Sequence, residues 1–202
     1  MSYIVHDYYF KKAKVQNYVA RSIFKLCEID ERFKLFRQGD TVLDLGAAPG
    51  SWSQYVSQKI GPQGQVLGID LCAISLKISN ATFLTGDLNE MNLDEVLKEN
   101  NFGKFFDVVI SDMAPKTTGV RVVDQTASLG LCELALDIAK EFLKPHGSLV
   151  CKLFHSADFQ VFKRDVQKKF SKVNVFIPKS TRKESKEVFL IAQNKLDSNY
   201  NT

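Results

Sequence analysis

The chain has 202 residues with 45% apolar side chains, enough for one domain with a substantial core. Its apolar runs are shorter than the roughly 20 residues that a membrane-spanning helix needs, and its first residues lack a signal-peptide pattern. The four cysteines form no C-x-x-C pair and the three histidines have no metal-ligand spacing. We therefore expect a cytoplasmic protein with reduced thiols, no metal site and no membrane segment.

The net charge is only +4, but basic residues are concentrated in the first 37 residues. Residues 1–19 combine lysines with aromatic side chains, which is typical either of a solvated terminus or of an arm that contacts nucleic acid. Residues 20–37 are predicted to form a basic helix, because apolar residues recur there at helical spacing. Taken alone, Lys25 in this helix has the pattern of an ordinary exposed lysine.

The chain is organised around residues 41–53, T-V-L-D-L-G-A-A-P-G-S-W-S. A Val- and Leu-rich run is followed by small residues, and from Trp52 onward apolar residues recur at helical spacing. This order predicts a buried strand, a tight turn and the start of a helix, where ligands bind in open α/β sheets. Gly46 and Gly50 would let the backbone approach a ligand closely, because they carry no Cβ.

From residue 41 onward, strand and helix patterns alternate, as in a mostly parallel seven-stranded sheet flanked by helices. We predict a single α/β domain over 1–202, in which the helix at 124–143 turns Leu131 and Leu134 toward the sheet. The predicted strands are 41–45, 65–69, 82–84, 105–110, 148–154, 173–176 and 188–192, and the other predicted helices are 52–60, 92–100 and 157–170.

Acidic residues accompany the first four predicted strands. Asp44 lies in the first strand, and Asp70, Asp87 and Asp112 follow the second, third and fourth. Each acid taken singly could be a loop residue or a helix N-cap. The carboxyl ends of parallel strands meet at one edge, however, and like charges gathered there are unfavourable without a ligand or a basic group among them. The set therefore predicts a binding site.

The turn itself distinguishes among the ligands that such a site could hold. A dinucleotide fingerprint reads G-x-G-x-x-G and places a pyrophosphate at the helix N-terminus, whereas this turn reads G-A-A-P-G. Asp44 would repel a pyrophosphate but would suit a ligand with a cationic amine and a sulfonium. The pattern therefore favours S-adenosylmethionine over NAD or FAD, with Asp70 accepting hydrogen bonds from its ribose.

Two further charged residues lie in apolar surroundings near the end of the chain. Lys152 interrupts the apolar run 149–154, so its ammonium group must either reach solvent at a sheet edge or serve a functional site. Glu187 begins the last apolar run and, taken alone, is typical of an exposed strand end.

Several segments together resemble the FtsJ-like ribosomal RNA 2′-O-methyltransferases over nearly the whole chain. The chain departs from the family's usual residues at Ser51, where Gly is more common, and at Lys116, where the bacterial enzymes usually have Asn. The resemblance implies a Rossmann-like class I methyltransferase fold that uses S-adenosylmethionine. The matching segments are Asp44–Gly50 with Trp52–Gln54, Arg21–Leu26, Ser111–Pro115 and the basic loop before Glu187.

The resemblance also implies roles for individual residues. Those matching the family's cofactor-binding positions are Gly50, Trp52, Asp70, Asp87 and Asp112, to which the turn itself adds Asp44 and Gly46. Those matching the Lys-Asp-Lys-Glu tetrad of ribose 2′-O-methylation are Lys25, Asp112, Lys152 and Glu187. A ribose hydroxyl must lose its proton to attack a methyl group, and a lysine can accept that proton only when neutral, a form that burial and a neighbouring cation favour.

The expected reaction is methylation of a uridine 2′-OH in large-subunit ribosomal RNA by a monomeric enzyme acting on the RNA or the subunit. Methylation of transfer RNA or of an mRNA cap uses the same tetrad, and a non-catalytic RNA-binding assembly factor is an alternative of another class.

Two later groups of basic residues suggest a groove that binds RNA. The first group is Lys163, Arg164, Lys168, Lys169 and Lys172, and the second is Lys179, Arg182, Lys183 and Lys186.

Overall fold

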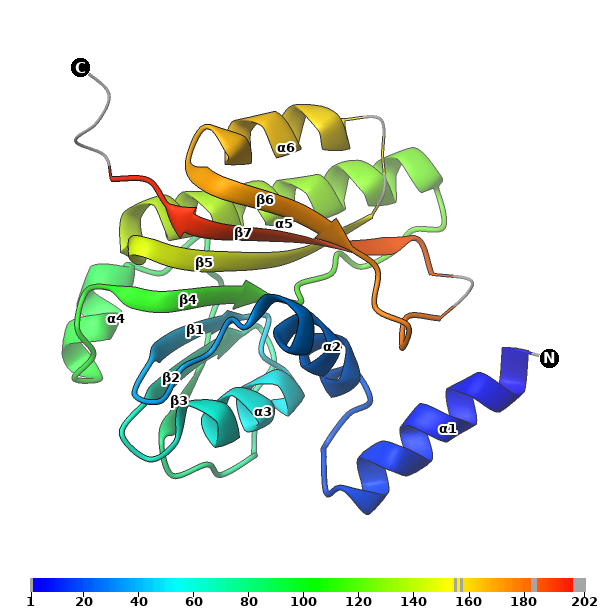
Figure 1. The fold of residues 1–202 in the computed structure, drawn as a ribbon, viewed down its shortest axis with the longest axis horizontal. Coiled ribbons are helices and arrows are strands. Elements are labelled where there is room, and N and C mark those ends of the chain that lie inside the picture. The colour runs from blue at the N-terminus through cyan, green and yellow to red at the C-terminus, as the bar shows by residue number, and fades with distance from the viewer. Residues whose placement is uncertain (1, 155, 157, 183–184, 198–202) are drawn as a thin grey trace.

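The computed structural model describes residues 2–154, 156, 158–182 and 185–197, with side chains from residue 8 onward. A seven-stranded sheet forms the middle layer between two layers of helices (Figure 1). The strands are β1 Thr41–Leu45, β2 Gln65–Asp70, β3 Ala81–Thr85, β4 Phe106–Ser111, β5 Leu143–Phe154, β6 Phe170–Phe176 and β7 Glu187–Lys195. The helices are α1 Ser2–Val15, α2 Ile23–Phe33, α3 Ser51–Ile60, α4 Leu93–Glu99, α5 Arg121–Phe142 and α6 Phe159–Gln167.

The strand order is β3-β2-β1-β4-β5-β7-β6. The five strands β1 to β5 run parallel, and β7 lies antiparallel between β5 and β6. Leu45 pairs with both Ile69 and Ser111, so β1, β2 and β4 end at the same edge of the sheet. The predicted α/β fold with a mostly parallel seven-stranded sheet is confirmed, and a ligand site is expected at this edge.

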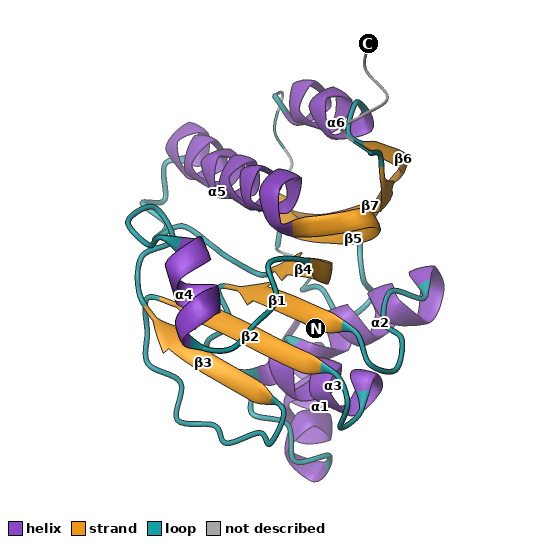
Figure 2. Cartoon of the chain, turned by 90° about the vertical axis from the view of Figure 1, so that its left-hand side faces the viewer, coloured by secondary structure: helices purple, strands orange, loops and turns teal. Residues whose placement is uncertain are grey.

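Each face of the sheet has its own core, because neighbouring residues of a strand point to opposite faces. One core joins α4, α5 and α6 to residues such as Leu43 and Cys151, and the other joins α2 and α3 to residues such as Val42 and Val150. Figure 2 shows α4, α5 and α6 on one side of the sheet and α1, α2 and α3 on the other. A buried side chain of β5 therefore reaches either the α2 face or the α5 face.

At two positions the inward face of α5 differs from the predicted one. Leu131 and Leu134 are only partly buried, whereas Ser128, Cys132 and Ala135 are buried. These small residues let α5 approach the sheet closely, and the Ser128 hydroxyl accepts a hydrogen bond from the Phe154 amide at 3.0 Å. Leu136 is also buried in this core, and Leu134 packs against its margin.

The N-terminal segment is helical over Ser2–Val15, where the sequence suggested a basic arm without assigning it a structure. Tyr9 packs on Phe24 of α2 with ring centroids 5.4 Å apart, and Ala13 is buried in the α2–α3 core. Figure 1 shows α1 at the lower right, joined to α2 by a loop. Its inner side is therefore held against the domain, while Tyr8 and Phe10 are exposed.

Candidate active site

The turn between β1 and α3 depends on two glycines with positive φ. Gly46 has a φ of 74° and Gly50 a φ of 104°, a backbone region that favours glycine. A Cβ on Gly46 would lie 2.6 Å from Cγ of Met113, and one on Gly50 would lie 2.9 Å from Cδ2 of Leu76. These glycines therefore accommodate neighbouring protein segments as well as any ligand.

A cavity of about 350 Å³ opens at the carboxyl ends of β1 to β4. Gly46, Asp70, Asp87 and Asp112 all line it, so the structure brings together residues predicted from four separate strands. Sequence reasoning did not single out the apolar part of the lining, although the helical spacing of the α5 leucines was a usable signal. That part includes Ile69, Leu71, Leu88, Met113, Leu131 and Leu134.

Backbone amides donate hydrogen bonds to two carboxylates of the cavity, those of Asp70 and Asp87. The Asp70 oxygens accept hydrogen bonds from the amides of Ala48 at 2.9 Å and Cys72 at 2.8 Å. Each carboxylate oxygen has a second lone pair, so Asp70 can still accept hydrogen bonds from a ligand hydroxyl. Hydrogen bonds from the backbone and side chain of Asn89 hold the pKa of Asp87 below its ordinary value, which keeps this carboxylate charged.

Asp44 lies behind the cavity lining. Its side chain is fully buried, and Oδ2 accepts a hydrogen bond from the Ser53 hydroxyl at 2.7 Å. Burial raises the pKa of Asp44 to about 7, with smaller contributions from Asp112 and Asp70. Its Oδ1 is buried without a hydrogen-bond partner among the described residues, so Asp44 can accept a further proton or a donor.

Lys152 is buried in the middle of the sheet and not at an edge. Its strand β5 lies between β4 and β7, and the residue is 8% exposed. Because Ser111 pairs with Cys151, the next residues on the two strands, Asp112 and Lys152, are neighbours. The Lys152 Nζ lies 2.9 Å from Oδ1 of Asp112 and donates to its main-chain oxygen at 2.5 Å. Snorkelling at an edge is therefore excluded.

Lys25 and Glu187 form a second ion pair on the same face of the sheet. Their Nζ and Oε1 atoms are 2.5 Å apart, and both side chains are largely buried. Lys152 pairs in register with Phe189, so Glu187, two residues earlier in β7, is its diagonal neighbour on the α2 face. The Lys25 Nζ lies 5.9 Å from the Phe189 ring centroid. The four predicted tetrad residues thus lie close together as two neighbouring ion pairs, although they are widely separated in sequence.

A second cavity of about 580 Å³ lies beside the Lys25–Glu187 pair. Arg21 and Arg182 add two cations to its lining, and Glu187 is the one carboxylate among the described residues that line it. The two cavities meet the tetrad from different sides, because Asp112 lines the first and Lys25 with Glu187 lines the second. Sequence reasoning identified Arg21 and Arg182 as basic but did not place them at the site.

The described residues that line the first cavity do not include Gly50, Trp52 or Asp44, three of the predicted cofactor-binding residues. Trp52 is buried, its ring packs 5.9 Å from that of Phe189, and its Nε1 donates to the main-chain oxygen of Ser22 at 3.0 Å. The indole therefore packs against Phe189, the ring that also faces the tetrad residue Lys25. Cofactor binding by these three residues stays a prediction.

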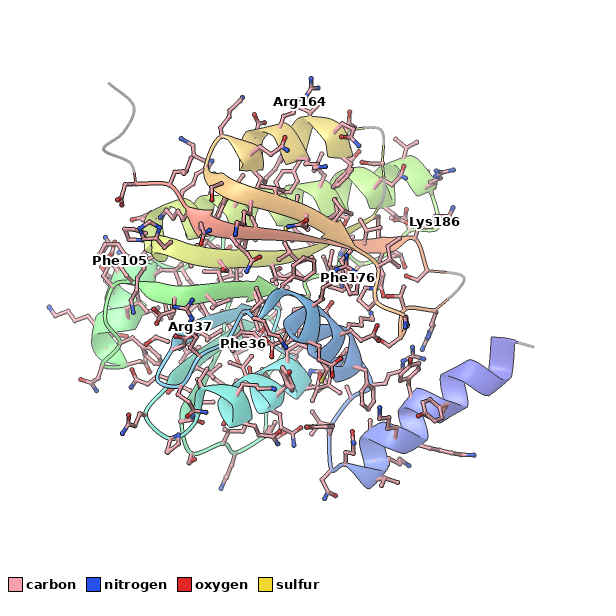
Figure 3. The ribbon with its side chains drawn as sticks, viewed as in Figure 1. Phe36, Arg37, Phe105, Arg164, Phe176 and Lys186 are labelled. Atoms are coloured by element: carbon pink, nitrogen blue, oxygen red, sulfur yellow. The ribbon has the colours of Figure 1, made fainter. Side chains whose placement is uncertain are left out.

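The basic groups lie on different parts of the surface. Figure 3 shows Arg164 pointing outward from α6 and Lys186 extending from the loop before β7. Since α6 packs on the α5 face, its residues Lys163 and Arg164 lie across the sheet from the tetrad, whereas Lys172 of the same group belongs to β6. Of the group that begins at Lys179, Arg182 lines the second cavity, and Lys183 falls outside the described residues. Three further lysines are carried by α1, namely Lys11, Lys12 and Lys14.

The described part of the chain has neither a metal-ligand cluster nor a membrane-spanning helix. It contains no group of three or more His, Cys, Asp and Glu side chains placed to hold a metal ion. No described helix is long and apolar enough to cross a membrane. All four cysteines are free, and Cys132 and Cys151 are buried.

The sheet order and the cavity at its carboxyl edge define a Rossmann-like α/β methyltransferase. A crystal structure of a ribosomal RNA methyltransferase from Plasmodium falciparum superposes with a TM-score of 0.80 at 26% identity, covering 89% of this chain and 99% of that one. The family model for FtsJ-like methyltransferases matches residues 18–195. The chain therefore belongs to the FtsJ-like methyltransferase family.

Similar sequences cover almost the whole chain. A protein of Bdellovibrio bacteriovorus named ribosomal RNA large subunit methyltransferase E is 54% identical, covering 96% of this chain and all of that protein. A protein of the same name from Desulfatibacillum aliphaticivorans is 47% identical, covering 94% of this chain and 90% of that protein. The chain is accordingly a methyltransferase.

Proposed function

We propose that this enzyme transfers a methyl group from S-adenosylmethionine to a uridine ribose 2′-OH in large-subunit ribosomal RNA. The observation that carries the proposal is the placement of the tetrad between two cavities of different character. The first is small and partly apolar with fixed carboxylates, and the described lining of the second carries three cations, Arg21, Lys25 and Arg182, against one carboxylate. A cationic donor molecule fits the first cavity, and a polyanionic strand fits the second.

The first cavity has the size and donor set for the methyl donor. Its volume of about 350 Å³ lies within the range of small-molecule sites. Asp70 would accept the ribose hydroxyls, Asp87 would lie near the adenine, and Asp112 would lie at the methionine end beside the tetrad. Bound there, S-adenosylmethionine would supply an electrophilic methyl group on a sulfonium.

The tetrad would prepare the acceptor hydroxyl. Lys152, as the neutral amine, would take the hydroxyl proton; its side chain is buried and its partner Asp112 belongs to the donor cavity. Lys25 would add a second positive charge near the developing alkoxide, and Glu187 would fix the orientation of Lys25. In-line transfer needs little beyond this alignment, so positioning would supply much of the rate.

The second cavity and the basic loop would hold the RNA strand. Arg21 and Arg182 line the cavity, and guanidinium groups bind phosphate by paired hydrogen bonds. The α1 lysines would extend this surface, with the exposed Tyr8 and Phe10 on the same helix available for stacking. We propose a single methyltransferase domain with no separate RNA-binding unit.

The test is to map 2′-O-methylated nucleotides in ribosomal RNA of large subunits incubated with labelled S-adenosylmethionine and the protein. A new methyl group on one uridine ribose is expected. Methylation of transfer RNA or capped RNA alone would favour those alternatives. A protein that binds the donor and the subunit but transfers nothing to any of these RNAs would be an assembly factor.

A further inference from the structure

Side chains at the start of α2 contact the described part of the loop before the tetrad residue Glu187, residues 177–182 and 185–186. Arg21 lies in the turn just before α2, and Lys25 and Glu28 lie three residues apart within the helix, a spacing that places two side chains on one face. Lys25 holds Glu187, and the other two side chains hold the main chain of the loop. The same face of the helix therefore positions both the loop and the carboxylate at its end.

Glu28 makes the most specific of these contacts. The amides of Lys179 and Ser180 donate to its two carboxylate oxygens at 2.6 and 2.9 Å. Arg21 Nη2, from the turn just before α2, donates to the main-chain oxygen of Ser180 at 2.7 Å, so Ser180 is held through both of its main-chain polar groups. Ser180 is 1% exposed, which shows that this part of the loop is packed rather than solvated.

The length of the loop calls for such an anchor. Its flanking strands β6 and β7 are antiparallel neighbours, and a hairpin of this kind can be closed by a two-residue turn. The longer connection carries Arg182 and Ser185 to the wall of the second cavity, opposite Arg21 and Lys25. Extra loop residues add conformational entropy that must be removed before these side chains face the acceptor strand.

We propose that Glu28 is a positioning residue which pins this loop to α2, so that Glu187 meets Lys25 and the second cavity has its working shape. Glu28 is not one of the described residues that line either cavity. Its effect on catalysis therefore passes through the loop. The activity part of this inference rests on the proposed function, whereas the structural part does not.

The experiment compares Glu28→Gln with Glu31→Gln. The first change preserves the size of the side chain but places an amide NH₂ where an oxygen accepts a hydrogen bond. The second removes the same charge from an exposed position of the same helix. Both are compared with the parent by amide hydrogen exchange, by limited trypsin digestion after Lys179 and Arg182, and by methyl transfer to large subunits.

In Glu28→Gln we expect the Lys179 and Ser180 amides to exchange about 10- to 100-fold faster, because a hydrogen bond to a charged acceptor is lost. Trypsin should cleave the loop faster. The kcat for RNA should fall by about tenfold or more, since a misplacement of about 1 Å can cost 100-fold. The KM for S-adenosylmethionine should stay at the parental value, because the first cavity is untouched. Glu31→Gln should match the parent in every assay.

Unchanged amide exchange in Glu28→Gln would overturn the pinning role, whatever the activity. Faster exchange with a parental kcat would overturn the catalytic consequence. An equal loss of kcat in Glu31→Gln would assign the effect to general charge and not to the loop. If the parent transfers no methyl group, the proposed function fails, and the exchange and trypsin measurements still decide whether Glu28 holds the loop.

Discussion

Replacing Lys152 by Met should both destabilise the protein and stop methyl transfer, and the structure allows the two effects to be separated. Met keeps an apolar stem of similar length, so the change removes the ammonium group without opening a large cavity. The side chains of Lys152 and Asp112 are 9% and 19% exposed, so their ion pair is mostly shielded from water. The substitution leaves the Asp112 carboxylate without the cation 2.9 Å away.

Breaking a buried ion pair from one side typically costs 3–5 kcal/mol. We expect about 3 kcal/mol here, the lower end, because Asp112 keeps some contact with solvent at the cavity. For a domain of this size, each kcal/mol lowers the melting temperature by about 2–4 °C. Lys152→Met should therefore melt roughly 6–12 °C below the parent.

The double variant Lys152→Met with Asp112→Asn is the control for stability. It has no uncompensated buried charge, so it should recover most of the lost free energy of unfolding, as measured by urea denaturation of the four proteins in the cycle. It should not recover activity. A double variant whose stability loss equals the sum of the two single losses would show that the pair is not coupled.

Single-turnover transfer of labelled methyl to large subunits measures the other effect. Loss of a general base costs typically 10²- to 10⁴-fold, and Lys152→Arg should not restore the rate because a guanidinium group stays protonated. Subunit binding is measured in parallel. Transfer by Lys152→Met at near the parental rate, in folded protein, would refute the assignment of Lys152 as the base.

Three further predictions follow from the geometry. Asp70→Ala should weaken S-adenosylmethionine binding in calorimetry by about 10- to 100-fold, because charge-assisted bonds to the ribose and the Ala48 amide are lost; an unchanged Kd in folded protein would exclude this role. The folded-state pKa of Asp44, about 7, lies above its ordinary value of 3.8, so its contribution to stability is complete below about pH 4 and is lost as pH rises through about 7. Asp44→Asn should accordingly gain stability relative to the parent as pH rises from about 4 to about 7 in urea unfolding, and parallel pH profiles would contradict this. RNA affinity should fall steeply with salt, with a shallower slope when the three α1 lysines are changed to Glu, and an affinity independent of salt would remove the proposed RNA surface.

The sequence by itself determined the alternating strands and helices after residue 41 and the edge of the sheet at which the site lies. The apolar run before Gly46, the small residues after it and the helical spacing from Trp52 are local patterns, and they match β1, the turn and α3. Acids after successive strands predicted a shared cavity, since parallel strands end at one edge, and Asp70, Asp87 and Asp112 do line one. Local periodicity suffices for such features because it depends on residues near one another in the chain.

The tertiary structure alone decided which charges are paired and which are buried. Alternation along β5 puts Lys152 on one face of the sheet, but only the antiparallel insertion of β7 brings Glu187 beside it and under Lys25. The burial of Asp44 behind the cavity and the hold of Glu28 on a loop 151 residues away have no local signature. Periodicity tells which way a side chain points, whereas its partner depends on strand order, register and the packing of α2, which are set by contacts across the whole chain.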